Sequence, residues 1–136
     1  MKNKFLLPIL LLSLISTPCL SETRGDLFQR DGIYYKRFTD TIFSGKVTGK
    51  EQGRIRNGKK EGDWIWYHKN GRQVFLKKIY KNGREEGNSV SYHENGELWD
   101  KVTYKNGKKE GEMIGYHNNG KLRNKVTYKS GKEEGK

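Results

Sequence analysis

Hydrophobic and polar residues alternate along most of this chain, in short segments that end at glycine-containing turns. Between residues 98 and 104, Leu98, Val102 and Tyr104 are apolar, whereas Lys101 and Thr103 are polar. A period of two residues predicts a β-strand with one buried face. No segment after residue 21 shows the period of a helix. The pattern therefore predicts an all-β protein.

Asn-Gly pairs separate the predicted strands. Six such pairs are present, together with Ser130-Gly131 and Asp31-Gly32. Both residues of an Asn-Gly pair tolerate the positive φ angles of a type I′ turn, which makes the pair the strongest local signal for a β-hairpin. The strands are therefore expected to pair antiparallel with their neighbours in sequence, as a meander.

A tyrosine followed by a turn recurs about every 12 residues, and two tyrosine series can be aligned: Tyr80, Tyr104 and Tyr128, and Tyr67, Tyr92 and Tyr116. Within each series the spacing is 24 or 25 residues. Self-similarity of this kind predicts a tandem array of hairpins, each stabilised by its neighbours. The first repeat has one extra residue between Gly71 and Tyr80, which we expect a β-bulge near Phe75 to absorb.

The strands that begin at Gly62, Gly87 and Gly111 present two faces. On one face the residues stay apolar in every repeat: Ile65 and Tyr67, Val90 and Tyr92, Ile114 and Tyr116. On the other face, Trp64 and Trp66 are replaced by serine, methionine or glycine in later repeats. We therefore expect the first face to pack and the second to be free to vary.

Residues 1–21 have the plan of a cleaved export signal. Lys2 and Lys4 precede an apolar stretch at 5–15, and a polar segment follows at 16–21. The apolar stretch is shorter than the roughly 20 residues that span a bilayer. Cleavage after Ser21 would remove Cys19, the only cysteine, whereas lipidation of Cys19 as in a bacterial lipoprotein is the alternative. We expect an exported protein, periplasmic or secreted.

Composition alone suggests a disordered basic chain, because aliphatic residues are scarce and the formal charge is +12. The positions of glycine and tyrosine in the repeat reverse that interpretation. Removal of Lys2 and Lys4 with the signal would leave a charge of +10. By parity, four basic residues share the face opposite Tyr104 and Tyr128, where Trp99 is also expected: Lys101, Lys105, Lys125 and Lys129.

A Gly-x-x-x-x-Tyr-x-x-Asn-Gly strand, as at 62–71, alternates with a Tyr-Lys-Asn-Gly-Lys-x-x-Gly strand, as at 104–111. This alternation resembles the MORN-repeat variant family over residues 26–136. The resemblance implies a family block at 22–53 and tandem MORN-type β-hairpin repeats at 54–136. Bacterial proteins of this type are commonly labelled YwqK-family antitoxins, which implies a protein that neutralises a toxin without catalysis. An antitoxin against a cytoplasmic toxin should stay inside the cell. The export signal therefore favours a role in the envelope.

Metal binding and catalysis are not favoured by the repeated polar residues. The three histidines occupy one repeat position, namely His68, His93 and His117. Equivalent strands should lie roughly 10 Å apart, too far for one zinc ion that needs nitrogens at about 2.1 Å.

Four glutamates recur in equivalent loops: Glu61, Glu86, Glu110 and Glu134. Their recurrence favours turn chemistry over an acid/base pair. We expect no metal, cofactor or catalytic residue.

The sequence thus favours an exported, non-enzymatic repeat protein that binds another macromolecule across the face of a β-meander. By resemblance the partner is a toxin or effector protein. The alternative is an envelope protein that binds acidic lipid or polymer through a basic aromatic face, and export disfavours nucleic acid. The candidate partner-binding residues are Trp64, Trp66, His68, Trp99, Lys101, Lys105, Lys125 and Lys129.

Overall fold

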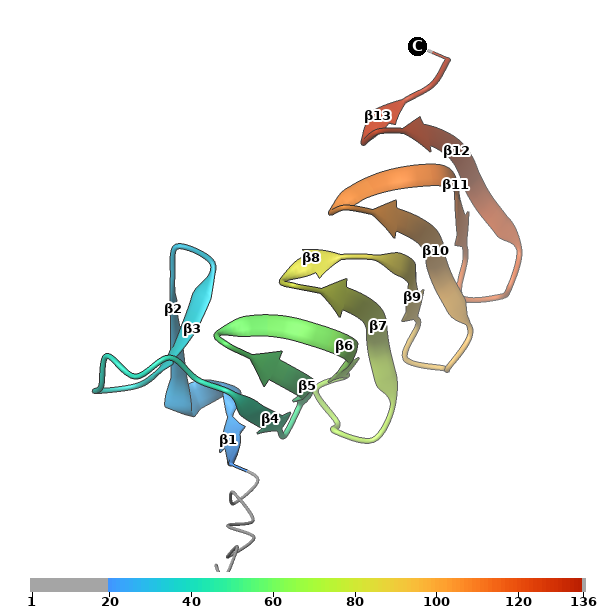
Figure 1. Cartoon of the computed structure of the whole chain (residues 1–136). Coiled ribbons are helices and arrows are strands. Elements are labelled where there is room, and N and C mark those ends of the chain that lie inside the picture. Colours follow the sequence, from blue (N-terminus) through green and yellow to red (C-terminus); the bar gives the residue numbers. More distant parts are fainter. Residues whose placement is uncertain (1–19, 136) are drawn as a thin grey trace, which may run out of the picture.

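The computed structural model describes residues 20–135 (Figure 1). The elements before the repeats are β1 (Ser21–Thr23), a 3-10 helix η1 (Arg24–Asp26), β2 (Leu27–Arg30), β3 (Ile33–Lys36) and β4 (Gly45–Thr48). The expected export segment and Cys19 lie outside the described residues. Ser21, the expected last residue of that segment, is the first residue of β1.

The remaining strands follow in sequence order. They are β5 (Glu51–Arg56), β6 (Lys59–Tyr67), β7 (Val74–Lys81), β8 (Arg84–Glu85), β9 (Gly87–Tyr92), β10 (Leu98–Lys105), β11 (Lys108–Tyr116), β12 (Leu122–Lys129) and β13 (Lys132–Glu133). Within residues 20–135, no helix is long and apolar enough to cross a membrane.

The strands form an eleven-stranded sheet and a separate β2–β3 hairpin (Figure 1). From β4 to β13 the sheet is antiparallel with neighbours in sequence order, apart from short β8, which pairs with β7 alone. The exception to this antiparallel order is β1, which pairs in parallel with β4. The predicted all-β meander of hairpins is confirmed.

Two kinds of turn join the strands. In one kind both central residues have positive φ, as in Asn82 (50°) and Gly83 (80°), which is the predicted type I′ turn. In the other, after each histidine, only the glycine has positive φ, and its N–H donates to the histidine carbonyl, at 2.8 Å from Gly71 to His68. Half of the Asn-Gly pairs therefore form a different turn from the one expected.

A β-bulge occurs at the same place in every repeat. Phe75, Trp99 and Arg123 each lack a cross-strand partner where the register shifts. The bulge expected at Phe75 is present, but it does not absorb the extra residue of the first repeat. That residue lies in the preceding turn, because the His68 N–H donates to Gln73 whereas the His93 N–H donates to Glu97.

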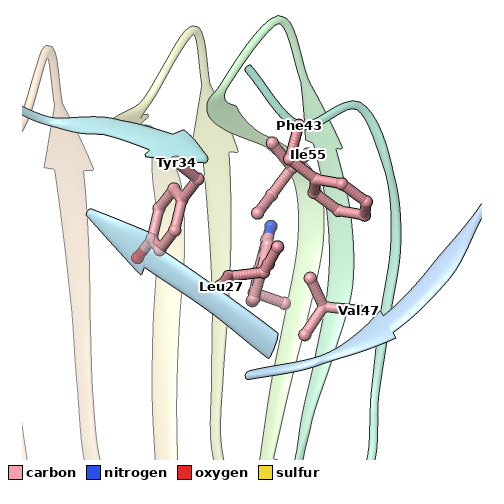
Figure 2. Packing of buried hydrophobic residues seen from close by; sticks show 6 residues of the cluster. Leu27, Tyr34, Phe43, Val47 and Ile55 are labelled. Carbon is pink, nitrogen blue, oxygen red and sulfur yellow. The ribbon is translucent and has the colours of Figure 1, made fainter. Parts of the chain in front are cut away.

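The core lies where the β2–β3 hairpin packs against the first strands of the sheet. Figure 2 shows the side chains that converge there, among them Leu27, Tyr34, Phe43, Val47 and Ile55, and Trp64 completes the cluster. The hairpin is joined to the turn at Asn57 and Gly58 by a hydrogen bond from the Tyr34 N–H to the Gly58 carbonyl, at 2.8 Å.

The predicted packing face of the repeat strands is wrong. Trp64 is fully buried, and Ser89 is buried opposite Val102, whereas Ile65 and Val90 are only half-buried. Residues paired directly across two antiparallel strands project from the same face. The register therefore turns the tryptophan and serine positions inward, and the consistently apolar positions lie on the outer face.

Candidate binding surface

An ammonium group occupies the centre of the aromatic cluster inside the first repeat. Lys60 Nζ lies 4.0 Å from the ring centroid of Trp64, 4.7 Å from that of Trp66 and 5.3 Å from that of Tyr80. It also forms an ion pair of 2.6 Å with Glu51. Burial lowers the pKa of Lys60, and the Glu51 carboxylate opposes that effect. The rings and the carboxylate together stabilise a charge that burial would otherwise disfavour.

This cation site is already filled by the protein's own side chain. Sequence reasoning did not find it. The pattern offered no local signal, since the four groups around Lys60 come from β5, β6 and β7. The aromatic residues of the first repeat therefore serve the fold.

The loop glutamates join consecutive hairpins. Glu61 accepts a hydrogen bond of 2.8 Å from the N–H of Asn82 in the next type I′ turn. The same contact recurs from Asn106 to Glu86, at 2.8 Å, and from Ser130 to Glu110, at 2.7 Å. The turn chemistry predicted for these three glutamates is confirmed.

Two histidines also join consecutive hairpins. Nε2 of His68 lies 3.1 Å from the Tyr92 carbonyl oxygen, and Nε2 of His93 lies 3.0 Å from that of Tyr116. Because a carbonyl can only accept, Nε2 carries the proton in both rings. The two rings are half-buried and join neighbouring hairpins, while His117 is exposed. Within residues 20–135, no group of three His, Cys, Asp or Glu side chains could hold a metal ion.

The structure removes the tryptophans from the predicted binding face. Trp64 has no exposed surface, and its Nε1 donates to the Arg54 carbonyl at 3.2 Å. Trp66 is half-buried beside it, with ring centroids 5.9 Å apart. Both face inward because of the strand register, so the expectation that they vary freely at a surface is wrong.

Trp99 lies at a bulge, so the strand period does not place it with the lysines. Its ring stacks on His93 at 5.3 Å between centroids and faces Phe75 at 6.2 Å. Its Nε1 is buried without a hydrogen-bond partner in the described residues. Trp99 therefore belongs to the half-buried strip that links His68, Phe75 and His93, and the predicted combination of tryptophans with lysines on one face is not formed.

The four predicted lysines are all exposed. Lys101 and Lys125 lie in one row with Lys77 and with aliphatic residues of the neighbouring strands. Cross-strand pairing orders the row as Ile65, Lys77, Val90, Lys101, Ile114 and Lys125. These six residues form the lysine face. A shallow hollow beside Lys77 is lined by Ile65, Ile79 and Val90, so this face offers both charge and apolar surface.

Lys105 and Lys129 lie at the type I′ turns, where like charges face each other. Four cross-strand pairs occur there in successive hairpins: Arg56 with Lys59, Lys81 with Arg84, Lys105 with Lys108, and Lys129 with Lys132. These eight residues form the turn edge, and none of them has an ion-pair partner within 4 Å in the described part of the chain. Like charges directly opposite each other destabilise a sheet. The turn edge is therefore a column of basic side chains without ion pairs, although the loop glutamates bond to the backbone of the same turns.

Two segments, residues 85–106 and 109–130, match the MORN repeat variant. They include β9, β10 and β12 and all but the first residue of β8 and of β11, so this part of the chain consists of MORN-type repeats. The comparison with curated proteins gives no match, and neither does the comparison with solved structures.

Proposed function

We propose that this protein is an exported, non-enzymatic repeat protein that binds another macromolecule through its lysine face. By the resemblance of its repeats, the partner is a toxin or effector protein that it neutralises. The observation that carries this proposal is the alternation of exposed lysines with half-buried aliphatic residues in one row across three repeats. An acidic protein surface with apolar patches is complementary to such a row.

The environment of the loop carboxylates supports a function without catalysis. Glu61, Glu86 and Glu110 each accept a hydrogen bond from a backbone amide of the next turn. Carboxylates held in this way are structural groups, with an oxygen occupied by the fold. Binding of a macromolecule at the lysine face does not need these carboxylates to react.

The test uses the product of a toxin-like gene beside the gene for this protein. Binding of that purified product is measured for the wild type and for the double variant Lys77→Glu, Lys101→Glu. We expect the variant to bind at least about tenfold more weakly, since two attractive contacts become repulsive. The matched control is Lys69→Glu, Lys121→Glu, which changes the net charge equally in exposed turns at the other end of the hairpins.

Two results would refute the proposal. One is the absence of a specific protein partner for the wild type. The other is an equal loss in the lysine-face variant and in the control, which would mean that net charge alone matters.

The turn edge favours a second candidate function, binding to an anionic lipid or envelope polymer. Its like-charged pairs recur once per hairpin, roughly every 10 Å, as expected for strands spaced about 4.8 Å apart. Binding of polyphosphate or of anionic vesicles should then fall steeply between about 0.1 and 0.5 M salt. The variant Lys105→Gln, Lys108→Gln should weaken binding to polyphosphate or vesicles. A packed protein interface on the lysine face would instead largely survive the rise in salt, and the variant Lys77→Glu, Lys101→Glu would weaken it.

A further inference from the structure

Phe38, in the turn that follows β3, combines two unfavourable features. Its φ angle is 64°, and its side chain is 96% exposed. A residue with a Cβ is strained in the left-handed region, and small polar residues tolerate that region better than bulky ones. The other five non-glycine residues with positive φ in residues 20–135 are Asp31, Asn57, Asn82, Asn106 and Ser130. Phe38 is thus the bulky exception.

The turn around Phe38 is held by hydrogen bonds on both sides. The Thr39 N–H donates to the Lys36 carbonyl at 3.2 Å, and the Lys36 N–H donates to the Thr41 carbonyl at 3.0 Å. The Arg37 N–H donates to the Asp26 carbonyl at 2.8 Å, which ties the turn to η1. The strained residue is therefore presented in a defined position.

The hydrogen bonds of the turn hold the strained backbone, but the ring of Phe38 gains no aromatic or cation–π contact in the described chain. The ring of Phe38 forms no contact with another aromatic ring or with a cation there, although Phe28 and Tyr35 stack nearby on the β2–β3 hairpin with centroids 5.3 Å apart. Arg37, the preceding residue, is exposed and forms no ion pair within 4 Å in residues 20–135, and its charge contributes only the smallest part of the lowering of the Asp26 pKa. Strained residues cluster at ligand clamps and other functional sites, so a strained and exposed phenylalanine points to contact with another molecule.

We propose that Phe38 is an anchor residue that inserts into an apolar pocket of a protein partner, while Arg37 pairs with a carboxylate at the rim of that pocket. Exposed aromatic and arginine side chains held in rigid positions are typical of the residues that dominate protein–protein binding. This inference deepens the proposed function, on which it rests, by naming a second contact outside the repeats.

Other occupants fit the site less well. A membrane surface fits less well, because the single ring of Phe38 inserts less apolar surface than an amphipathic element does. A second copy of this chain carries the same large positive charge and would be repelled. A protein pocket with a carboxylate at its rim needs only one inserted ring, and it complements the net positive charge of the chain.

Photo-crosslinking tests the occupant directly. Benzoylphenylalanine replaces Phe38 in the full chain, produced in the native cell, and cells are irradiated. The matched control carries the probe at Leu122, which is 60% exposed but lies on β12. We expect one defined protein to be captured from position 38 and not from position 122. Adducts with lipid, adducts with a second copy of the chain, or no adduct would overturn the proposal.

Affinity for the captured protein, once purified, gives the second test. Phe38→Asn should lower it by about 30-fold or more, the effect expected of a central anchor, whereas Phe38→Leu should retain most of it. Leu122→Asn should leave it unchanged. Equal affinity of the wild type and Phe38→Asn would overturn the proposal.

The folded state provides a readout that separates an anchor from a structural residue. Because asparagine tolerates positive φ, Phe38→Asn should raise the melting temperature by about 2–6 °C. A lower melting temperature would mean that Phe38 stabilises the chain and would overturn the anchor role. If Phe38→Asn loses binding while Lys77→Glu, Lys101→Glu binds normally, the lysine face fails as the binding surface and the anchor stands; the reverse result rejects the anchor alone.

Discussion

Trp64 lies directly over Gly53 of the neighbouring strand, and this contact allows an indole ring to occupy the centre of a small core. A Cβ at Gly53 would lie 2.3 Å from Cδ2 and 2.4 Å from Cε2 of the ring. The ring also packs against Lys60 and Tyr80, so one displaced side chain would disturb the whole cluster. The stability of the core therefore depends on Gly53, because a side chain at this position would occupy the space of the Trp64 ring.

Gly53→Ala should therefore destabilise the protein by about 1–3 kcal/mol, the usual cost of overpacking a core. Urea unfolding followed by circular dichroism measures the change. Gly25→Ala is the matched control, because its Cβ would meet its nearest atom, Thr23 Oγ1, at 3.6 Å, an ordinary contact. Equal stabilities of the two variants would contradict the role assigned to Gly53.

The hairpin is the next scale, and each hairpin is held to the following one by a recurring set of polar contacts. A loop glutamate accepts from the next turn, as Glu86 does from Asn106, and the turn glycine donates to the preceding hairpin, at 2.8 Å from Gly107 to Glu85. At the other end a histidine donates to the next tyrosine carbonyl. These contacts satisfy backbone groups that a sheet with bulges would otherwise leave unpaired. They explain how the array holds together with few aliphatic residues.

The three histidines permit a test inside one chain. His93→Ala removes the donor to Tyr116 and the ring that stacks on Trp99, so the free energy of unfolding should fall by about 1–3 kcal/mol. His117→Ala should change it by less than about 0.5 kcal/mol, since His117 is exposed and forms no side-chain hydrogen bond in the described residues.

His93→Phe separates the two contributions, because it keeps a ring against Trp99 but removes the donor. Chemical denaturation of the four proteins provides the comparison. An equal loss of stability in His117→Ala and His93→Ala would mean that the hydrogen bond between hairpins does not cause the loss, because His117 forms no such bond in the described residues.

For the whole molecule, the interior is aromatic and partly charged. Burial raises the pKa of Tyr34, Tyr80 and Tyr104, and nearby carboxylates add to the rise for Tyr80 and Tyr104. Lys78 and Glu85 form an ion pair within the same interior. The stability of such a molecule should depend on alkaline pH more than that of a molecule with an aliphatic core.

The direction of the pH dependence follows from the difference in tyrosine pKa between the folded and unfolded states. Each tyrosine binds its proton more tightly in the folded state than in the unfolded state, where the pKa is about 10, so its contribution is complete below about pH 10 and is lost as the pH rises further. Lys60 acts in the opposite direction, since its pKa is lowered by burial, but one lysine opposes three tyrosines. The free energy of unfolding should therefore fall above about pH 10.

Urea unfolding at about pH 8, 10 and 11 measures this dependence. Tyr80→Phe should reduce the slope by up to about 1.4 kcal/mol per pH unit, the value for one proton. Tyr116→Phe is the control, because Tyr116 lies on the outer face outside this aromatic interior. A slope that Tyr80→Phe leaves unaltered would assign the alkaline loss to other groups.

The sequence by itself determined the hairpins, the turns and the repeat. These features are local: alternation sets a strand, and Asn82-Gly83 adopts a type I′ turn because both residues tolerate positive φ. The same local chemistry made the glutamates recognisable as turn residues. The bulge at Phe75 was also predictable in place, although its repetition at Trp99 was not.

Only the tertiary structure decided which face is buried and which residues remain for a partner. Ser89 faces inward because it pairs with Val102, and Trp64 is buried because the β2–β3 hairpin closes over it. The ammonium group of Lys60 and the exposed ring of Phe38 are likewise set by segments distant in sequence or by the backbone of one turn. Burial depends on contacts between such segments, and a period of two residues cannot say which of its two faces will meet them.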